Sequence, residues 1–155
     1  MPMAELKEQL HTDMTASMKA RDALRTQTLR MVMTAISNAE VAGKESQHLT
    51  DADVVAILVS EHKKRKEAAE AFDLGKRPEL ADKERAEAAI LSEYLPEPLS
   101  DTELTEIIAA AIAQANGADL GMKAMGQVMG LVTPQTKGRA DGSAVAAEVK
   151  RQLGV

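Results

Sequence analysis

Residues 119–142 have the sequence DLGMKAMGQVMGLVTPQTKGRADG, in which glycines interrupt an apolar pattern with helical spacing. The apolar side chains recur every three or four residues, which predicts a helix over about 121–133 that stops at Pro134. Each interior glycine costs a helix roughly 1 kcal/mol relative to alanine. The glycines are Gly121, Gly126 and Gly130. We therefore expect a close approach to this backbone, either by a neighbouring helix or by an external ligand.

The remainder of the chain also shows helical periodicity and no alternation typical of strands. The predicted fold class is therefore all-α. The other helices are expected over residues 3–20, over a segment with a core stripe at 28–39 that ends near Gly43, and over 50–72, 79–94, 100–117 and 143–153.

The best boundary between structural units is Pro96–Ser100. Pro96 and Pro98 disfavour helical backbone in the residues before them, so they end the preceding helix. Ser100 with Glu103 has the spacing of a capping box that begins the next one. We expect an N-terminal module of about four helices in residues 1–96 and a three-helix tail in 97–155.

Composition excludes several classes of protein. The 155 residues include no cysteine, so disulfides, thiolate catalysis and cysteine-ligated zinc are ruled out. No apolar run approaches the roughly 20 residues that span a bilayer, and no secretory signal is evident. Metalloprotease, calcium-loop and nucleotide-loop motifs are also missing. We expect a cytoplasmic protein with no membrane partner, no metal, no cofactor and no catalytic residues.

Charge is distributed unevenly along the chain. The net charge is −5, yet residues 119–155 have five basic and three acidic side chains. Only this end suits an anionic partner, although an ordinary solvated surface explains the charge equally well.

The turn at 137–142, KGRADG, is the best candidate for a phosphate contact. Its small residues would admit a phosphate, its two cations would attract one, and the following helix N-terminus offers free amides. Phe72 and Tyr94 are the only aromatic residues, so stacking of bases on an aromatic platform is excluded. The alternative is a plain interhelical turn capped by Asp141 or Ser143.

Charged residues occupy core-facing positions in two predicted helices. Glu61 and Arg65 lie on the apolar stripe of the third helix, and Glu87 interrupts that of the fourth. Because buried charges must be paired, we predict a structural ion pair of Arg65 with Glu61 and with Glu87 across the bundle. A carboxylate-lined catalytic or metal site is the alternative. The basic run at 62–66 is interpreted as a solvated helix face, with a secondary phosphate contact as its alternative.

Several strings in this order resemble the YqeY family. They are YLPEPLS at 94–100, MGQVMG at 125–130, KGRADG at 137–142, LRMV at 29–32 and the helix at 61–72. The resemblance covers nearly the whole chain. This family is similar to the C-terminal helical and tail region of the B subunit of the tRNA-dependent amidotransferase, and the likeness implies an all-α fold with a three-helix tail.

In that enzyme the tail approaches the body of the tRNA. By resemblance, the candidate RNA contacts of this chain are Lys123, Lys137, Gly138, Arg139 and Gly142. The catalytic cradle of the subunit has no counterpart in these 155 residues. Carbon–nitrogen ligase activity with glutamine as amide donor is therefore not expected of this chain acting alone.

Three functions follow from these observations. The first is a non-catalytic accessory module that binds tRNA or structured RNA through phosphates and shape. The second is a protein-interaction module that docks an amidotransferase or an aminoacyl-tRNA synthetase through the methionine-rich sixth helix or its glycines. The third is an amidotransferase-like enzyme, which lacks a nucleophile, a metal site and an ATP loop in the sequence.

Overall fold

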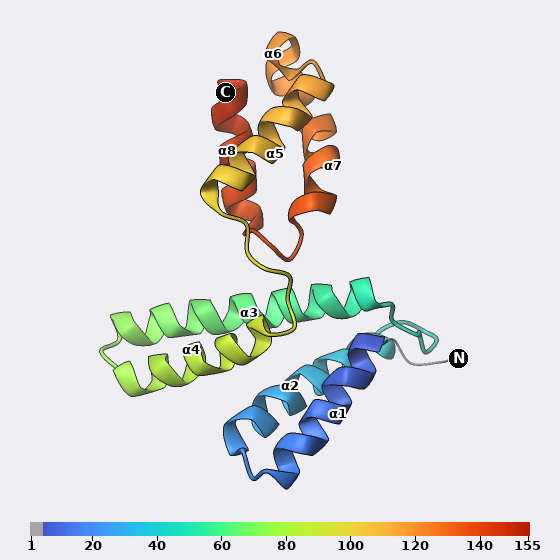
Figure 1. The fold of residues 1–155 in the computed structure, drawn as a ribbon, viewed down its shortest axis with the longest axis vertical. Helices are drawn as coiled ribbons and strands as arrows, with labels where there is room; N and C mark the ends of the chain where they lie inside the picture. Colours follow the sequence, from blue (N-terminus) through green and yellow to red (C-terminus); the bar gives the residue numbers. More distant parts are fainter. Residues whose placement is uncertain (1–4) are drawn as a thin grey trace. The chain divides into compact units, whose positions relative to one another are not determined.

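A computed structural model describes residues 5–155, and this part of the chain consists of helices and connections without any β-strand (Figure 1). The all-α prediction is confirmed. The chain divides into two compact units, Met1–Leu95 and Pro96–Val155. The predicted start of the first helix at residue 3 lies outside the described residues.

The N-terminal unit contains four helices: α1 (Glu5–Lys19), α2 (Ala23–Glu40), α3 (Asp51–Leu74) and α4 (Pro78–Ser92). Local sequence explains where they begin. Asp22 accepts a hydrogen bond from the Arg25 amide at the start of α2, and Thr50 with Asp53 forms a complete capping box before α3. Pro78 is the first residue of α4, where its missing N–H costs nothing.

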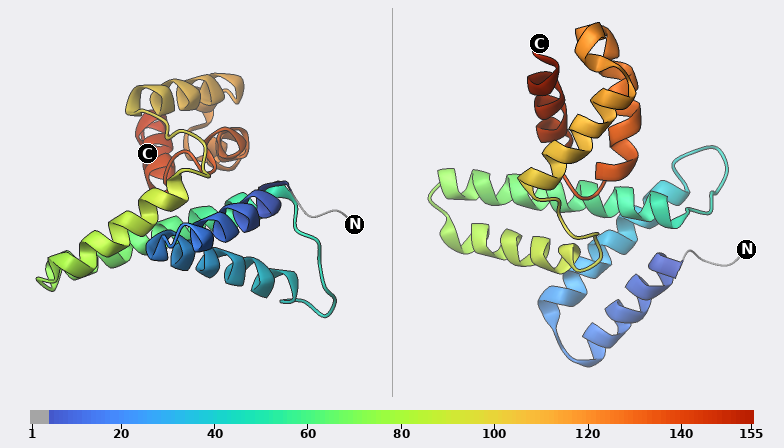
Figure 2. Two further views of the ribbon diagram at one scale, coloured as in Figure 1. Left: turned by 60° about the horizontal axis from the view of Figure 1, so that its bottom comes forward. Right: turned by 45° about the horizontal axis from the view of Figure 1, so that its top comes forward.

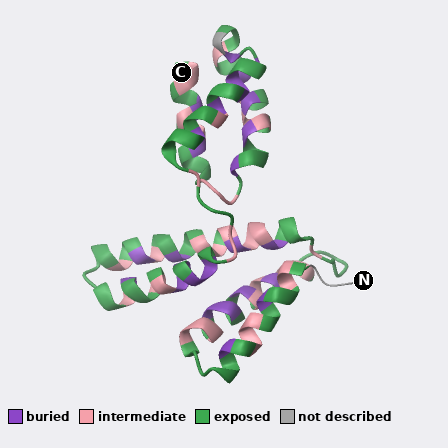
Figure 3. Cartoon of the chain, in the orientation of Figure 1, coloured by how far each residue is buried: buried purple, intermediate pink, exposed green. Residues whose placement is uncertain are grey.

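Aliphatic side chains from all four helices form the core of this unit. The fully enclosed ones are Leu10, Leu29, Val32, Ile36, Val54, Leu58 and Leu91. Figure 3 shows buried residues on the inward faces of these helices.

Helices α3 and α4 form a long antiparallel hairpin whose far end extends past α1 and α2 (Figures 1 and 2). Alanines line its interior, because Ala69, Ala81 and Ala88 are all buried. Small side chains allow two helix backbones to approach closely, which explains how the hairpin stays paired where α1 and α2 no longer support it.

The tail unit contains three longer helices, α5 (Asp101–Gln114), α7 (Met125–Thr136) and α8 (Gly142–Leu153). A short irregular segment between α5 and α7 consists of α6 (Gly117–Leu120) and the 3₁₀ helix η1 (Gly121–Ala124). Ile108, Val128, Val132 and Val149 are fully buried at its centre. Ser100 and Glu103 form the capping box predicted at the start of α5.

The predicted helix over 121–133 differs from the structure at both ends. A left-handed Asn116, with φ of 54°, follows α5, and Gly121, with φ of 58°, separates α6 from the turns that follow. Pro134 does not stop the helix, which continues to Thr136. Proline removes only its own N–H, and Lys137 N still donates to Thr133 O at 2.9 Å.

Gly117 is the glycine at which the tail packs most tightly. A Cβ at this position would lie 2.9 Å from Ile112 Cγ2 and 2.9 Å from Leu153 Cδ2. The sequence analysis expected a neighbouring helix or a ligand to approach Gly121, Gly126 and Gly130. The expectation of a neighbouring helix is wrong, because nothing in the described chain lies within 4 Å of a Cβ built at any of the three.

None of the helices in the described range is both long and apolar enough to cross a membrane.

Removal of the capping hydroxyl tests how the tail begins. Ser100 Oγ accepts a hydrogen bond from Glu103 N at 3.1 Å, and Glu103 returns one to Ser100 N at 3.3 Å. We expect Ser100→Ala to lower the free energy of unfolding by about 1 kcal/mol, measured by urea denaturation. Hydrogen exchange should accelerate in the first turn of α5. Ser143→Ala in α8 is the control and should change neither quantity, so equal effects of the two variants would contradict the capping role.

Candidate functional site

The turn between α7 and α8 is held by its own backbone. Arg139 N and Ala140 N both donate to Thr136 O, at 2.8 and 3.0 Å. Gly138 has φ of 80°, a conformation that an L side chain rarely adopts. Gly138 is therefore required by the geometry of the turn. Asp141 occupies the N-cap position of α8, and Gly142 begins the helix with an exposed backbone.

Arg139 is engaged within the tail. Its Nε donates to the carbonyl oxygen of Glu97 at 3.0 Å, and its own carbonyl accepts from Leu99 N at 2.8 Å. Its Nη2 also lies 4.0 Å from Glu103 Oε2. Capping hydrogen bonds from Ser100, together with the nearby Arg139, lower the pKa of Glu103. Arg139 thus fastens the segment before α5 to the α7–α8 turn.

Lys123 and Lys137 differ from Arg139 because their ammonium groups are available. Both residues are exposed, and within the described chain neither side chain forms a hydrogen bond or an ion pair. Lys123 lies in η1, immediately before α7, and Lys137 follows the last residue of α7. The two lysines therefore stand at opposite ends of one helix.

Between these lysines, α7 has an exposed face made of Gly126, Gly130 and Thr133. Their spacing of four and three residues places them on one side of the helix. All three are exposed, and a Cβ at either glycine would meet open space. The backbone is accessible here because no other part of the tail covers it. We refer to these three residues as the α7 face.

The methionines of this segment divide between core and surface. Met125 and Met129 pack against the tail core, whereas 55% of Met122 is exposed. Leu120, one turn earlier, is 45% exposed. Only the first methionine is thus available to a partner.

The predicted charged residues of the N-terminal unit are brought together. Arg65 Nη1 donates to Glu61 Oε2 at 3.3 Å and to the Glu61 carbonyl at 3.0 Å. Arg65 Nε lies 3.3 Å from Glu87 Oε2 without the geometry of a hydrogen bond, so that contact is electrostatic only. The side chains of Arg65 and Glu87 are 5% exposed. This cluster joins α3 to α4 inside the unit.

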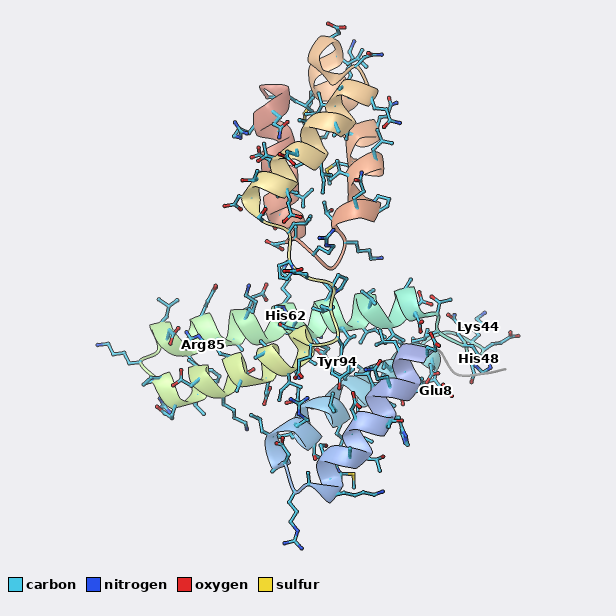
Figure 4. All side chains as sticks on the ribbon, in the orientation of Figure 1. Glu8, Lys44, His48, His62, Arg85 and Tyr94 are labelled. Atoms are coloured by element: carbon cyan, nitrogen blue, oxygen red, sulfur yellow. The ribbon has the colours of Figure 1, made fainter. Side chains whose placement is uncertain are left out.

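One polar pair had no signal in the sequence. His62 Nε2 lies 3.0 Å from Ser92 Oγ, although 30 residues separate them (Figure 4 labels His62). Burial, with a smaller contribution from Lys66, lowers the pKa of His62. Ser92 Oγ donates to the Ala88 carbonyl at 3.0 Å. Because the hydroxyl proton is engaged by that carbonyl, the pair does not have the arrangement of an activated serine nucleophile.

The basic run at 62–66 does not form one surface. Arg65 turns into the cluster with Glu61 and Glu87, while Lys63, Lys64 and Lys66 are exposed. In the described residues, no three carboxylate, imidazole or thiol side chains converge closely enough to hold a metal ion.

Comparison with known proteins assigns the family. The model of the family described as Yqey-like protein matches residues 7–153. The chain belongs to the YqeY-like family. The match includes both units, so the α7 face and the Arg65 cluster lie within the family's domain.

Fungal proteins are among the relatives of this chain. Altered inheritance of mitochondria protein 41, mitochondrial, from Pyrenophora tritici-repentis is 27% identical over 148 residues, which cover 94% of this chain and 79% of the relative. An uncharacterized protein of Schizosaccharomyces pombe is 38% identical over 86 residues, 55% of this chain and 68% of that protein. Altered inheritance of mitochondria protein 41, mitochondrial, from Saccharomyces cerevisiae is 30% identical over 97 residues, which cover 61% of this chain and 51% of that protein.

The Arg65 cluster gives a prediction about stability. Arg65→Leu would leave Glu61 and Glu87 without their shared cation, and removing one partner of a buried pair typically costs about 3–5 kcal/mol. We expect a loss of that order in urea denaturation. Lys64→Leu is the control, because Lys64 lies 3.6 Å from Glu61 but is 69% exposed and should cost less than about 1 kcal/mol.

A double variant separates charge from packing. Arg65→Leu/Glu87→Leu removes one charge of each sign and leaves only Glu61 without Arg65, so it should recover part of the stability lost by Arg65→Leu. No recovery would mean that the stem of Arg65, rather than its charge, stabilises the hairpin.

Proposed function

We propose that the tail unit binds tRNA or another structured RNA through phosphates and shape, as a non-catalytic accessory module. The observation that supports this function best is the α7 face, an uncovered strip of helix backbone with an available lysine at each end. The described tail also has Lys150 as an exposed cation, whereas Arg139 and Arg151 are engaged by neighbours.

The dimensions of the α7 face suit a nucleic-acid backbone. Lys123 and Lys137 are 14 positions apart, which corresponds to roughly 20 Å along a helix and spans several phosphates of one strand. Between them, the absence of side chains at Gly126 and Gly130 would let a sugar–phosphate chain approach the helix closely. Thr133 adds a hydroxyl that can contact a phosphate or a ribose.

The composition of the tail determines how it would recognise RNA. Its residues include no aromatic side chain, since Phe72 and Tyr94 both precede Pro96. Sequence-specific RNA readers commonly stack unpaired bases on aromatic rings, whereas duplex regions are recognised through shape, 2′-hydroxyls and phosphates. The proposed binding is therefore tolerant of RNA sequence and directed at structured RNA. The proposed location of this binding is the cytoplasm.

In this proposal the candidate residues have two different roles. Lys123 and Lys137 would contact phosphates directly. Gly138 and Arg139 would hold the turn that positions Lys137, and Gly142 would present the amide end of α8 nearby.

A second candidate is protein docking through the exposed pair Leu120 and Met122. Apolar side chains of this size are common at the centres of interfaces. Under that function, Met122→Glu would abolish capture of an amidotransferase or synthetase in nuclease-treated samples and leave RNA binding intact. Amide transfer with glutamine as donor rests on the family resemblance alone, and turnover by pure protein would be needed to support it.

The lysines supply the first test of RNA binding. We expect bulk tRNA to bind the full chain with an affinity that falls steeply as salt rises. In Lys123→Ala/Lys137→Ala the slope of log affinity against log salt should decrease by about two, because two phosphate contacts are lost. Lys150→Ala, on α8, is the control for the loss of an exposed tail lysine outside α7. An equal change in that control would move the binding surface away from α7, and salt-independent binding would refute the proposal.

Two double variants at the glycines of the α7 face test helix stability and tRNA binding separately. Because both positions are open, Gly126→Ala/Gly130→Ala should stabilise α7 by about 1 kcal/mol for each substitution. Gly126→Leu/Gly130→Leu should retain the fold by circular dichroism yet lose most tRNA affinity, since leucines would keep a phosphate backbone away from the helix. Ala144→Leu, at an exposed site on α8, is the control. Unchanged tRNA affinity in the double leucine variant would exclude the α7 face.

A further inference from the structure

A cavity of about 500 Å³ opens in the N-terminal unit between α1, the start of α2 and the end of α4. Its volume is within the range of small-molecule sites, about 300–1,000 Å³. The polar part of its lining consists of Gln9, Asp13, Ser17, Asp22, Arg25, Glu93 and Tyr94. The proposed RNA-binding residues all belong to the tail, and none of them lines this cavity.

Hydrogen bonds hold the walls of the cavity in place. Tyr94 Oη donates to Asp13 Oδ2 at 2.6 Å, which ties the second residue after α4 to α1 (Figure 4 labels Tyr94). Arg25 Nη2 donates to Glu93 Oε2 at 2.8 Å. Ser17 is buried at the α1 wall and shares a hydrogen bond of 2.7 Å with Thr26.

These bonds use one oxygen of each key carboxylate and leave the other. Among the described residues, no group donates a hydrogen bond to Asp13 Oδ1 or to Glu93 Oε1. Asp22, by contrast, receives the Arg25 amide at 3.1 Å and lies 3.7 Å from Arg25 Nε. One acceptor on α1 and one at the end of α4 are thus available.

The cavity has an excess of negative charge. Three carboxylates line it against the single guanidinium of Arg25. Burial raises the pKa of Tyr94, and its hydrogen bond to Asp13 raises it further, so the phenol remains a neutral donor. With three carboxylates and one guanidinium in its lining, the cavity favours a cation.

We propose that this cavity binds an alkylammonium group. An ammonium ion has three donors and no acceptor, and it can bond single oxygens of separate carboxylates such as Asp13 and Glu93. A guanidinium group prefers both oxygens of a single carboxylate, which the internal bonds of Asp13 and Glu93 prevent. Ala16 and Ala20 supply apolar contact for the methylene chain. The group belongs to a free diamine or polyamine, or to a lysine side chain of a partner protein.

Titration of the full chain with 1,5-diaminopentane, followed by amide NMR shifts, tests the proposal. We expect saturable shifts at the amides of residues 13, 17, 25 and 93. The neutral analogue 1,5-pentanediol should produce none. Equal shifts with both compounds, or none with the diamine, would overturn the proposal.

Charge variants distinguish an ammonium site from general attraction to an acidic protein. Glu93→Gln should weaken diamine binding about tenfold, the effect of losing one hydrogen bond between charged groups. Arg25→Gln should strengthen it, because a competing cation is removed. Glu93 and Arg25 are 54% and 32% exposed, so both variants should fold. Glu70→Gln, on the hairpin, is the control for net charge. A parallel loss in the control, or weaker binding in Arg25→Gln, would refute the site.

The source of the ammonium group is settled by a second ligand. Tighter binding of the diamine than of a lysine dipeptide with blocked termini would assign the cavity to free polyamines. The reverse order would assign it to a lysine of a partner protein. If neither ligand binds, the cavity is no ammonium site.

Discussion

The N-terminal unit depends on the ion pairs of one buried guanidinium. Arg65 lies between Glu61 on its own helix and Glu87 on α4, with only 5% of its side chain exposed. A buried cation without carboxylate partners would cost several kcal/mol, so α3 and α4 are stable in the register that joins these three residues. The same packing of α4 against the other helices brings Glu93 and Tyr94, which follow α4, to the cavity that α1 and α2 also line. The Arg65 cluster therefore helps to position α4, whose following residues Glu93 and Tyr94 line the cavity.

In the tail, a comparable role belongs to Arg139, which is less buried and bonds to backbone. It joins the segment after Pro96 to the α7–α8 turn through the carbonyl of Glu97 and the amide of Leu99. Because Arg139 is engaged in this way, Lys123 and Lys137 are the cations near α7 that are available to a ligand. Cations near a candidate RNA surface thus have separate structural and binding roles, which their sequence positions do not distinguish.

Membership of the YqeY-like family applies to both units, and the two units present different chemistry. The tail offers an open helix backbone between lysines, suited to phosphates. The N-terminal unit offers a cavity with excess carboxylate, suited to an ammonium group. If both proposals hold, the protein would combine an anion-binding and a cation-binding surface in one chain, on units that fold around separate cores.

The sequence by itself determined the fold class, the positions of most helices and the capping boxes, because these depend on residues within a few positions of one another. It also indicated that Arg65 needs carboxylate partners, since the helical period places charges on an apolar stripe. Only the tertiary structure decided which glycines are covered: Gly117 packs against Leu153, whereas Gly126 and Gly130 face open space. The bonds of Arg139 to the 97–99 segment and of Tyr94 to Asp13 join residues 42 and 81 positions apart. No local pattern specifies such partners, because they meet only when separate helices pack around a common core.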